Sequence, residues 1–104
     1  MRFESKTIYT AHNHNTRDKC NQIILFVLNK GYLPLNPFAV FPPETLDSLK
    51  LGKFERLALD MKLLAYCDEL WVFGNITYGV SKEIEWWKKH KSEPVKLYFL
   101  GGIR

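Results

Sequence analysis

Two carboxylates fall on the apolar sides of predicted helices, where burying an ionised group is costly. The first is Glu83, in a predicted helix over residues 80–91. At about 100° per residue it lies within roughly 60° of Val80 and roughly 40° of Trp87, so it projects along the apolar side of that helix. The second is Asp60, which borders the apolar side of the preceding predicted helix. Carboxylates so placed can act as nucleophiles or as general acids and bases, because a water-poor pocket shifts their ionisation.

Each carboxylate also has an ordinary structural interpretation. A core-facing Glu83 can pair with a lysine or cap a backbone amide, and Asp60 can pair with Arg56 one turn earlier. Glu85, on the same helix as Glu83, points to solvent. Both interpretations stay open on the sequence alone.

A turn at residues 74–79 leads directly into the helix that carries Glu83. The free backbone N–H groups of a helix start can hold an anion, and the hydroxyls of Thr77 and Ser81 add donors. Gly79 lets the backbone approach a ligand closely. The alternative is an ordinary helix cap followed by a turn glycine.

A second polar loop, over residues 11–15, follows the first predicted strand and contains His12, Asn13 and His14. An alternating pair of histidines at a strand end can ligate zinc, but the sequence offers no evident third ligand. We therefore expect no metal and no cofactor, and we interpret the loop as a substrate contact.

The elements that must position these residues alternate along the chain. Residues 7–11 are β-branched and aromatic, as in a strand, and residues 16–30 have apolar positions at helical spacing, with Asn15 as the expected N-cap and Gly31 as the stop. The remaining predicted elements are a strand over 32–35, a helix over 52–66, a strand over 69–74, a helix over 80–91 and a strand over 95–100, with a long irregular connection between 36 and 52. This alternation predicts an α/β fold: three layers around a flavodoxin-like or Rossmann-like parallel sheet of about four to five strands, in a single domain over 1–104. Ligands bind such sheets beyond the carboxyl ends of the strands, where the strand order reverses.

Composition agrees with one folded domain. The chain has 104 residues, 46% hydrophobic and 25% charged, with a formal net charge of +4. This balance is typical of a folded protein and excludes disordered and collagen-like chains. The longest apolar run, residues 23–28, is far shorter than the roughly 20 residues of a membrane span, and the charged start lacks the apolar stretch of a signal peptide. We expect a cytoplasmic protein without a membrane partner, in which Cys20 and Cys67 are reduced.

Basic residues gather near the end of the chain. Four lysines lie beside Trp86, Trp87 and His90, which is one pattern of a nucleic-acid-binding scaffold. The alternative, which we favour, is a solvated helix end whose lysines interact with the negative pole of the helix dipole.

Several short motifs follow one another in a definite order along the chain. Asp60 is followed eight residues later by Asp68, then by Glu69 and the apolar run LWVFG, and Gly79 precedes Glu83 by four residues. This order resembles the core of the nucleoside 2-deoxyribosyltransferase-like family, which includes 2-deoxynucleoside 5-monophosphate N-hydrolases and many small phage or bacterial proteins. Asn36 and Pro37 are similar to a further motif of that family, and the resemblance spans most of residues 7–100.

The resemblance implies an enzyme that acts on the N-glycosidic bond of a nucleoside or nucleotide, as a hydrolase or a transferase. It implies that Glu83 is the nucleophile, that Asp60 orients the sugar or exchanges a proton with the base, and that Tyr9 matches an early catalytic tyrosine. Transferase members carry Asp at the position of Thr77, and this difference favours a phosphorylated ligand held by Thr77 and Ser81. The substrate-binding residues that we expect are His12, Asn13, Asn36, Gly74, Asn75, Thr77, Gly79 and Ser81.

Two further expectations concern partners. The chain is shorter than most active members of the family, whose sites are commonly completed by a neighbouring subunit, so we expect a homodimer or a higher homo-oligomer with Trp86 and Tyr98 as contacts. The rival function is a binding module that holds a nucleotide-derived small molecule without cleaving it, and the third is the basic scaffold.

Overall fold

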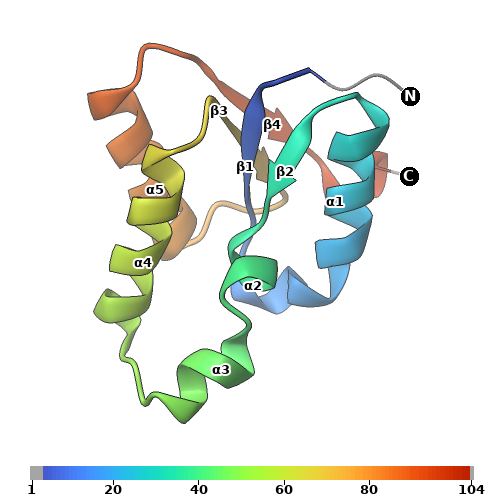
Figure 1. Ribbon diagram of the computed structural model, residues 1–104. Coiled ribbons are helices and arrows are strands. Elements are labelled where there is room, and N and C mark those ends of the chain that lie inside the picture. Colours follow the sequence, from blue (N-terminus) through green and yellow to red (C-terminus); the bar gives the residue numbers. More distant parts are fainter. Residues whose placement is uncertain (1–3, 104) are drawn as a thin grey trace.

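A computed structural model describes residues 4–103 and has the expected α/β architecture (Figure 1). Its strands are β1 (Thr7–Ala11), β2 (Leu33–Leu35), β3 (Glu69–Phe73) and β4 (Val95–Tyr98). Its helices are η1 (His14–Lys19), α1 (Cys20–Asn29), α2 (Pro37–Val40), α3 (Pro43–Ser48), α4 (Lys53–Ala65), α5 (Tyr78–His90) and η2 (Leu100–Gly102), where η denotes a 3-10 helix. Among these described residues no helix combines the length and apolarity that a membrane span requires.

The four strands form one parallel sheet in the order β2-β1-β3-β4. The chain moves outward from β1 to β2, then crosses to the other side of β1 to form β3 and β4. The strand order therefore reverses between β1 and β3, and the loops that follow these two strands flank the reversal. This is where a ligand is expected in an open parallel sheet.

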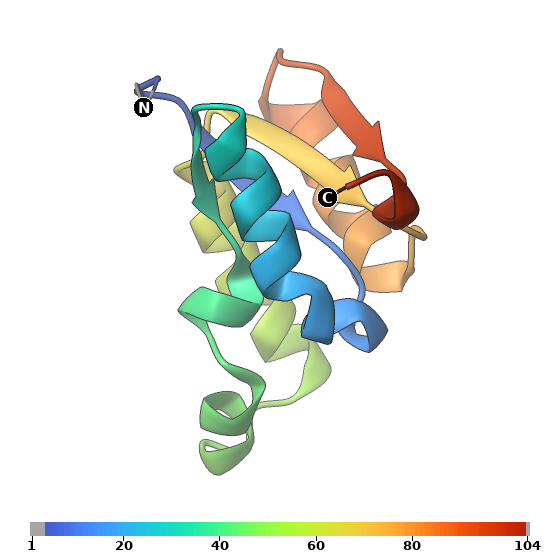
Figure 2. The ribbon, with the colours of Figure 1, turned by 90° about the vertical axis from the view of Figure 1, so that its right-hand side faces the viewer.

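Helices cover both faces of the sheet, which gives the three layers. On one face α1 packs against the sheet through Ile23 and Val27, and on the other α4 and α5 pack through Leu64, Val80 and Trp87. Figure 2 shows α1 in front of the sheet with α4 and α5 behind it. Because strand side chains alternate between faces, Tyr9 of β1 points toward the α4–α5 layer, whereas its neighbour Ile8 points toward α1.

The chain between β2 and α4 is more regular than the sequence prediction of an irregular connection. It contains the short helices α2 and α3, which lie at the carboxyl end of the sheet (Figure 1). Pro37 and Pro43 each open one of them, and the Asn36 side chain accepts a hydrogen bond from the Phe38 backbone N–H at 2.9 Å. Proline is preorganised for the first helical position and Asn is a favoured cap, so these residues start the two helices. Both helices are too short to show a helical periodicity in the sequence.

The helix starts and ends also differ in detail from the predictions. The expected N-cap Asn15 lies inside η1, and Asn13 is the residue that precedes this turn. Gly52 is the N-cap of α4, and its N–H donates to Glu55 Oε1 at 3.0 Å. Cys20 is partly exposed and Cys67 is buried, and neither forms a disulfide.

The aromatic residues expected at a dimer contact are partly buried and stack on other rings of the same chain. Tyr98 stacks on Phe73 with ring centroids 5.2 Å apart, and Trp86 stacks on His90 at 4.5 Å. The exposed apolar side chains at that end of the sheet are instead Leu97 and Phe99, which are 66% and 88% exposed. Tyr98 is held inward because strand alternation turns it toward the α1 face.

Candidate functional site

A cavity of about 480 Å³ opens at the carboxyl end of the sheet, at the reversal of strand order. The segments that line it come from the loops after β1 and β3, from α2, and from the first turns of α4 and α5. The lining residues are His12, Asn13, His14, Phe38, Leu51, Lys53, Arg56, Leu57, Asp60, Thr77, Tyr78, Gly79, Val80 and Glu83. The structure thus brings Glu83, Asp60, His12, Asn13, Thr77 and Gly79 together, as a ligand site requires.

Glu83 lies at the inner end of the cavity. It is only 5% exposed, and it shares the buried side of α5 with Val80 and Trp87, as the helical spacing predicted. Its Oε2 atom is buried and has no hydrogen-bond partner among the described residues. The neighbouring Lys82 instead pairs with the exposed Glu85 at 3.3 Å. An ion pair or a backbone cap therefore does not account for the burial of Glu83.

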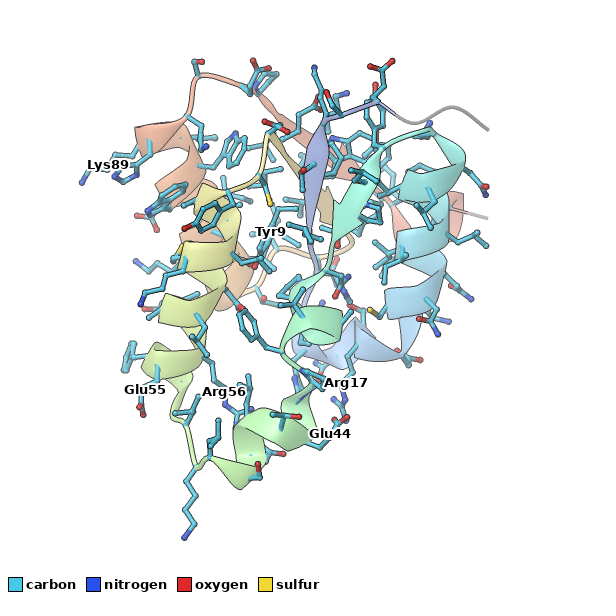
Figure 3. All side chains as sticks on the ribbon, in the orientation of Figure 1. Tyr9, Arg17, Glu44, Glu55, Arg56 and Lys89 are labelled. Atoms are coloured by element: carbon cyan, nitrogen blue, oxygen red, sulfur yellow. The ribbon has the colours of Figure 1, made fainter. Side chains whose placement is uncertain are left out.

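Asp60 lies across the cavity from α5, on α4. Burial raises the pKa of its carboxyl to about 7. The structural alternative, an ion pair with Arg56, is not formed, because Arg56 Nη2 donates to Asp47 Oδ1 of α3 at 2.6 Å. Figure 3 shows Arg56 extending from α4 toward the α2–α3 segment, with Glu55 pointing away from it.

Tyr9 stands behind the two carboxyl groups. It is fully buried on β1, between the sheet and the α4–α5 layer (Figure 3), and its hydroxyl has no hydrogen-bond partner among the described residues. Burial raises the pKa of Tyr9 well above its usual value, and the negative charges of Glu83 and Asp60 raise it further. Burial likewise raises the pKa of Glu83 to about 8, with a smaller upward effect from Asp60 and an opposing one from the Tyr9 hydroxyl. Tyr9, Asp60 and Glu83 thus form an acidic cluster. Asp60 and Glu83 line the cavity, whereas the fully buried Tyr9 lies outside its lining.

A hydrogen-bonded chain fixes the wall beside this cluster. Asn36 Oδ1 accepts from Phe38 N–H, so its Nδ2 donates to His12 Nε2 at 2.9 Å. His12 Nε2 is therefore the accepting nitrogen, and Nδ1–H donates to Thr16 Oγ1 at 2.9 Å. The Thr16 hydroxyl in turn donates to the backbone carbonyl of Asn13 at 2.8 Å.

This arrangement holds His12 in its neutral form, and burial lowers the pKa of His12. Both of its ring nitrogens are occupied, so the imidazole orients the loop after β1 and offers no free metal ligand. Within residues 4–103, groups of three or more potential metal-ligating side chains are absent. Asn36, which was expected to bind substrate, is buried behind His12 and positions it.

The turn before α5 contributes fewer contacts than expected. Thr77 and Gly79 line the cavity, but Ser81 does not, and its hydroxyl donates to the Tyr78 carbonyl at 2.7 Å. Asn75 is exposed outside the cavity. Gly74 also lies outside and has a structural role, because its φ of 80° favours glycine and an added Cβ would come within 2.9 Å of Leu100 Cδ1.

Five polar or aromatic residues of the cavity lining were not among the predicted site residues. They are His14, Phe38, Lys53, Arg56 and Tyr78. For two of them a signal existed: Lys53 and Arg56 precede Asp60 by seven and four residues, which places all three on one side of a helix. Phe38 and His14 gave no such signal, since their positions depend on the short segments η1 and α2.

The basic end of α5 lacks the free aromatic rings that a nucleic-acid surface uses. Trp87 is fully buried, and its Nε1–H donates to the Glu93 carbonyl at 2.7 Å. Lys91 donates to the carbonyls of Ala65 and Cys67 near the end of α4. Lys91 thereby links the end of α5 to the end of α4, whereas Lys88 and Lys89 are exposed, as in a solvated helix end.

Comparison with known proteins gives one match. A family model described as a domain of unknown function (DUF7768) matches residues 6–97. The chain belongs to the DUF7768 family. The match includes every residue that lines the cavity, so the cavity is part of the DUF7768 domain. No curated protein and no solved structure matches the chain.

Proposed function

We propose that this DUF7768 domain cleaves the N-glycosidic bond of a nucleoside or nucleotide, with Glu83 as the nucleophile. The observation that carries the proposal is the unpartnered carboxylate oxygen of Glu83 at the inner end of the cavity. A buried carboxylate oxygen without a partner destabilises the fold, and such costs are concentrated at sites that act on a ligand. The order of motifs that resembles the nucleoside 2-deoxyribosyltransferase-like family supports the same reaction.

In the proposed reaction a Glu83 carboxylate oxygen bonds to the anomeric carbon as the bond between that carbon and the base nitrogen breaks. Asp60, in its protonated form, gives its proton to the departing base. The Asp60 carboxylate then takes a proton from water as the water oxygen attacks the glycosyl ester, which releases the sugar and restores both the Glu83 carboxylate and the protonated Asp60. A second base in place of water would give transfer. Tyr9, whose hydroxyl lies near the Glu83 carboxyl, would donate a hydrogen bond to Glu83.

The test is base release from a pool of nucleosides and nucleotides, followed by chromatography. Glu83→Gln keeps the size of the side chain but removes its charge, so we expect turnover to fall by several orders of magnitude while ligand binding is largely retained. Asp60→Asn should also slow base release. Glu85→Gln is the matched control, because Glu85 lies on the exposed side of the same helix. A folded Glu83→Gln variant that releases base at the wild-type rate would refute the nucleophilic role.

One observation favours a second candidate, a non-catalytic module that binds a nucleotide-derived small molecule. A pKa of about 8 keeps Glu83 largely protonated at neutral pH in the empty cavity, and a protonated carboxyl is a poor nucleophile. A wild-type protein that binds a member of the pool and returns it unchanged would select this candidate. Mass spectrometry of the bound and free fractions makes that distinction.

A further inference from the structure

We propose that the cavity takes a phosphorylated substrate and that Arg56 and Lys53 hold the phosphate, in place of the α5 helix start. This inference rests on the proposed function, because it assigns the substrate class of the same cavity. It begins from the uneven distribution of charge around the cavity wall. The acidic cluster occupies the inner end, and the two cations lie in the first turn of α4.

The cations and the carboxyl group share one side of α4. With a rise of about 1.5 Å per residue, Arg56 precedes Asp60 by about 6 Å along the helix axis, and Lys53 precedes it by about 10 Å. All three line the cavity. A ligand that reaches Glu83 and Asp60 with its sugar can therefore reach the two cations with a substituent on that sugar.

The electrostatics favour a negative substituent at this end. Raised pKa values leave Asp60 and Glu83 partly or largely protonated at neutral pH, whereas Lys53 and Arg56 bring cationic side chains to the same wall. The wall as a whole is then positive, and an anion is stabilised near the cations and disfavoured near the carboxyl groups. A phosphate would bind at the α4 end for both reasons.

Arg56 is oriented for this task before any ligand arrives. Its Nε–H donates to the Leu51 carbonyl at 2.9 Å and its Nη2 to Asp47 Oδ1 at 2.6 Å, which leaves Nη1 out of these bonds. Asp47 is 69% exposed and accepts through one oxygen, so it holds the guanidinium without enclosing it. A planar guanidinium held in this way binds phosphate with little further loss of side-chain entropy.

Lys53 also lines the cavity, where it contacts the start of α5. Its ammonium nitrogen lies 4.1 Å from the centroid of the Tyr78 ring, which belongs to the first turn of α5. This cation–π contact holds the amine over the cavity mouth between the two helices. The competing site at the α5 start is weaker, because the Ser81 hydroxyl is already donated to the Tyr78 carbonyl.

The test compares two variants that break the same ion pair and for which we expect opposite effects on phosphate binding. Melting temperatures are measured with the four 2-deoxynucleosides and with their 5-monophosphates, and base release is followed in the same samples. In the wild-type protein we expect the monophosphates to raise the melting temperature more than the nucleosides do. Arg56→Gln should abolish most of that difference, whereas Asp47→Asn should keep or enlarge it, although both remove the ion pair between Asp47 and Arg56. Lys53→Gln should reduce the difference, and Lys88→Gln and Ser81→Ala should leave it unchanged.

The outcomes separate this inference from the proposed function. Equal effects of Arg56→Gln and Asp47→Asn on the monophosphate preference, or equal stabilisation by nucleosides and monophosphates, would overturn the phosphate site even where base is still released. Preference for monophosphates that depends on Arg56, without base release from any compound, would retain the phosphate site and reject cleavage. Absence of both binding and base release would reject both proposals.

Discussion

At the scale of single residues, the ionisation of two carboxyl groups determines how the proposed reaction depends on pH. Glu83 must be ionised to attack, and Asp60 must be protonated to assist the departing base, while the pKa values of the pair lie at about 8 and about 7. We expect kcat/KM to rise about tenfold per pH unit below 7, to be highest between 7 and 8, and to fall above 8. In Asp60→Asn the falling limb should disappear while the rate is lower throughout. A pH-independent wild-type rate would contradict the assigned roles.

The same carboxyl group predicts how stability depends on pH. The folded pKa of Glu83 lies above its unfolded value of 4.5, so the folded state binds the proton more tightly, and stability is lost as pH rises from about 4.5 to about 8. Glu83→Gln carries no such proton. The stability of this variant relative to wild type should therefore increase from pH 5 to pH 8.5, and its relative melting temperature should rise with it. The expected gain in unfolding free energy is on the order of a few kcal/mol, since each unit of pKa shift corresponds to about 1.4 kcal/mol. Thermal unfolding in a series of buffers measures it, with Glu85→Gln as the control, and a constant difference would show that Glu83 does not carry the raised pKa.

At the scale of elements, one amide holds α2 and the loop after β1 in place. In Asn36→Ala, His12 Nε2 loses its hydrogen-bond donor and the Phe38 backbone N–H loses its acceptor. His12 Nε2 is then unpaired in a buried place, and the Phe38 N–H in a partly buried one. We expect a loss of about 1–3 kcal/mol in unfolding free energy. Chemical denaturation measures it, and the exposed Asn75→Ala should stay within about 0.5 kcal/mol of wild type. Equal stability of the two variants would show that the buried chain does not support the wall.

The first turn of α5 offers a way to close the cavity without unfolding the protein. Gly79 lines the cavity, and a Cβ added there has no neighbouring heavy atom within 4 Å. Gly79→Leu should therefore keep or raise the melting temperature, because glycine is unfavourable inside a helix by about 1 kcal/mol, while its side chain occupies the ligand space. Ligand-induced stabilisation and base release should both fall. Gly79→Ala, which adds only one carbon, is the graded control, and full ligand binding by the Leu variant would place the ligand elsewhere.

The elements differ in how far the sequence could predict them. The strands and the long helices α1, α4 and α5 follow from hydrophobic periodicity and caps, and the same reasoning predicted the buried position of Glu83. The helices α2 and α3 contain only four and six residues, so no periodicity marks them. The partner of Arg56 could not be predicted either, because Asp47 reaches it only through the folded path of α3. The parts of the cavity that could not be predicted from the sequence are therefore those formed by short segments whose positions depend on tertiary contacts.

At the scale of the whole molecule, the sheet ends in an exposed apolar edge. Among residues 4–103, β4 pairs with β3 alone, so its other edge keeps free backbone groups, and Leu97 and Phe99 are exposed beside it. Free edges of this kind favour pairing with another strand. We expect a two-fold homodimer that buries this edge, and light scattering at micromolar concentration should give twice the chain mass. Leu97→Lys should shift the mass toward the monomer, and Lys88→Gln should not. A wild-type protein with the mass of one chain would reject the dimer.

The proton that the acidic cluster retains at neutral pH also has a thermodynamic consequence for ligand binding. A ligand that needs Glu83 ionised must expel the proton that the empty cavity retains at neutral pH, so association at pH 7 releases protons to the medium. The heat of binding then includes the enthalpy with which the buffer takes up those protons. Calorimetric titrations in PIPES and in Tris, two buffers of unlike ionisation enthalpy, would therefore give different apparent heats for one and the same association, and the difference would count the protons that leave.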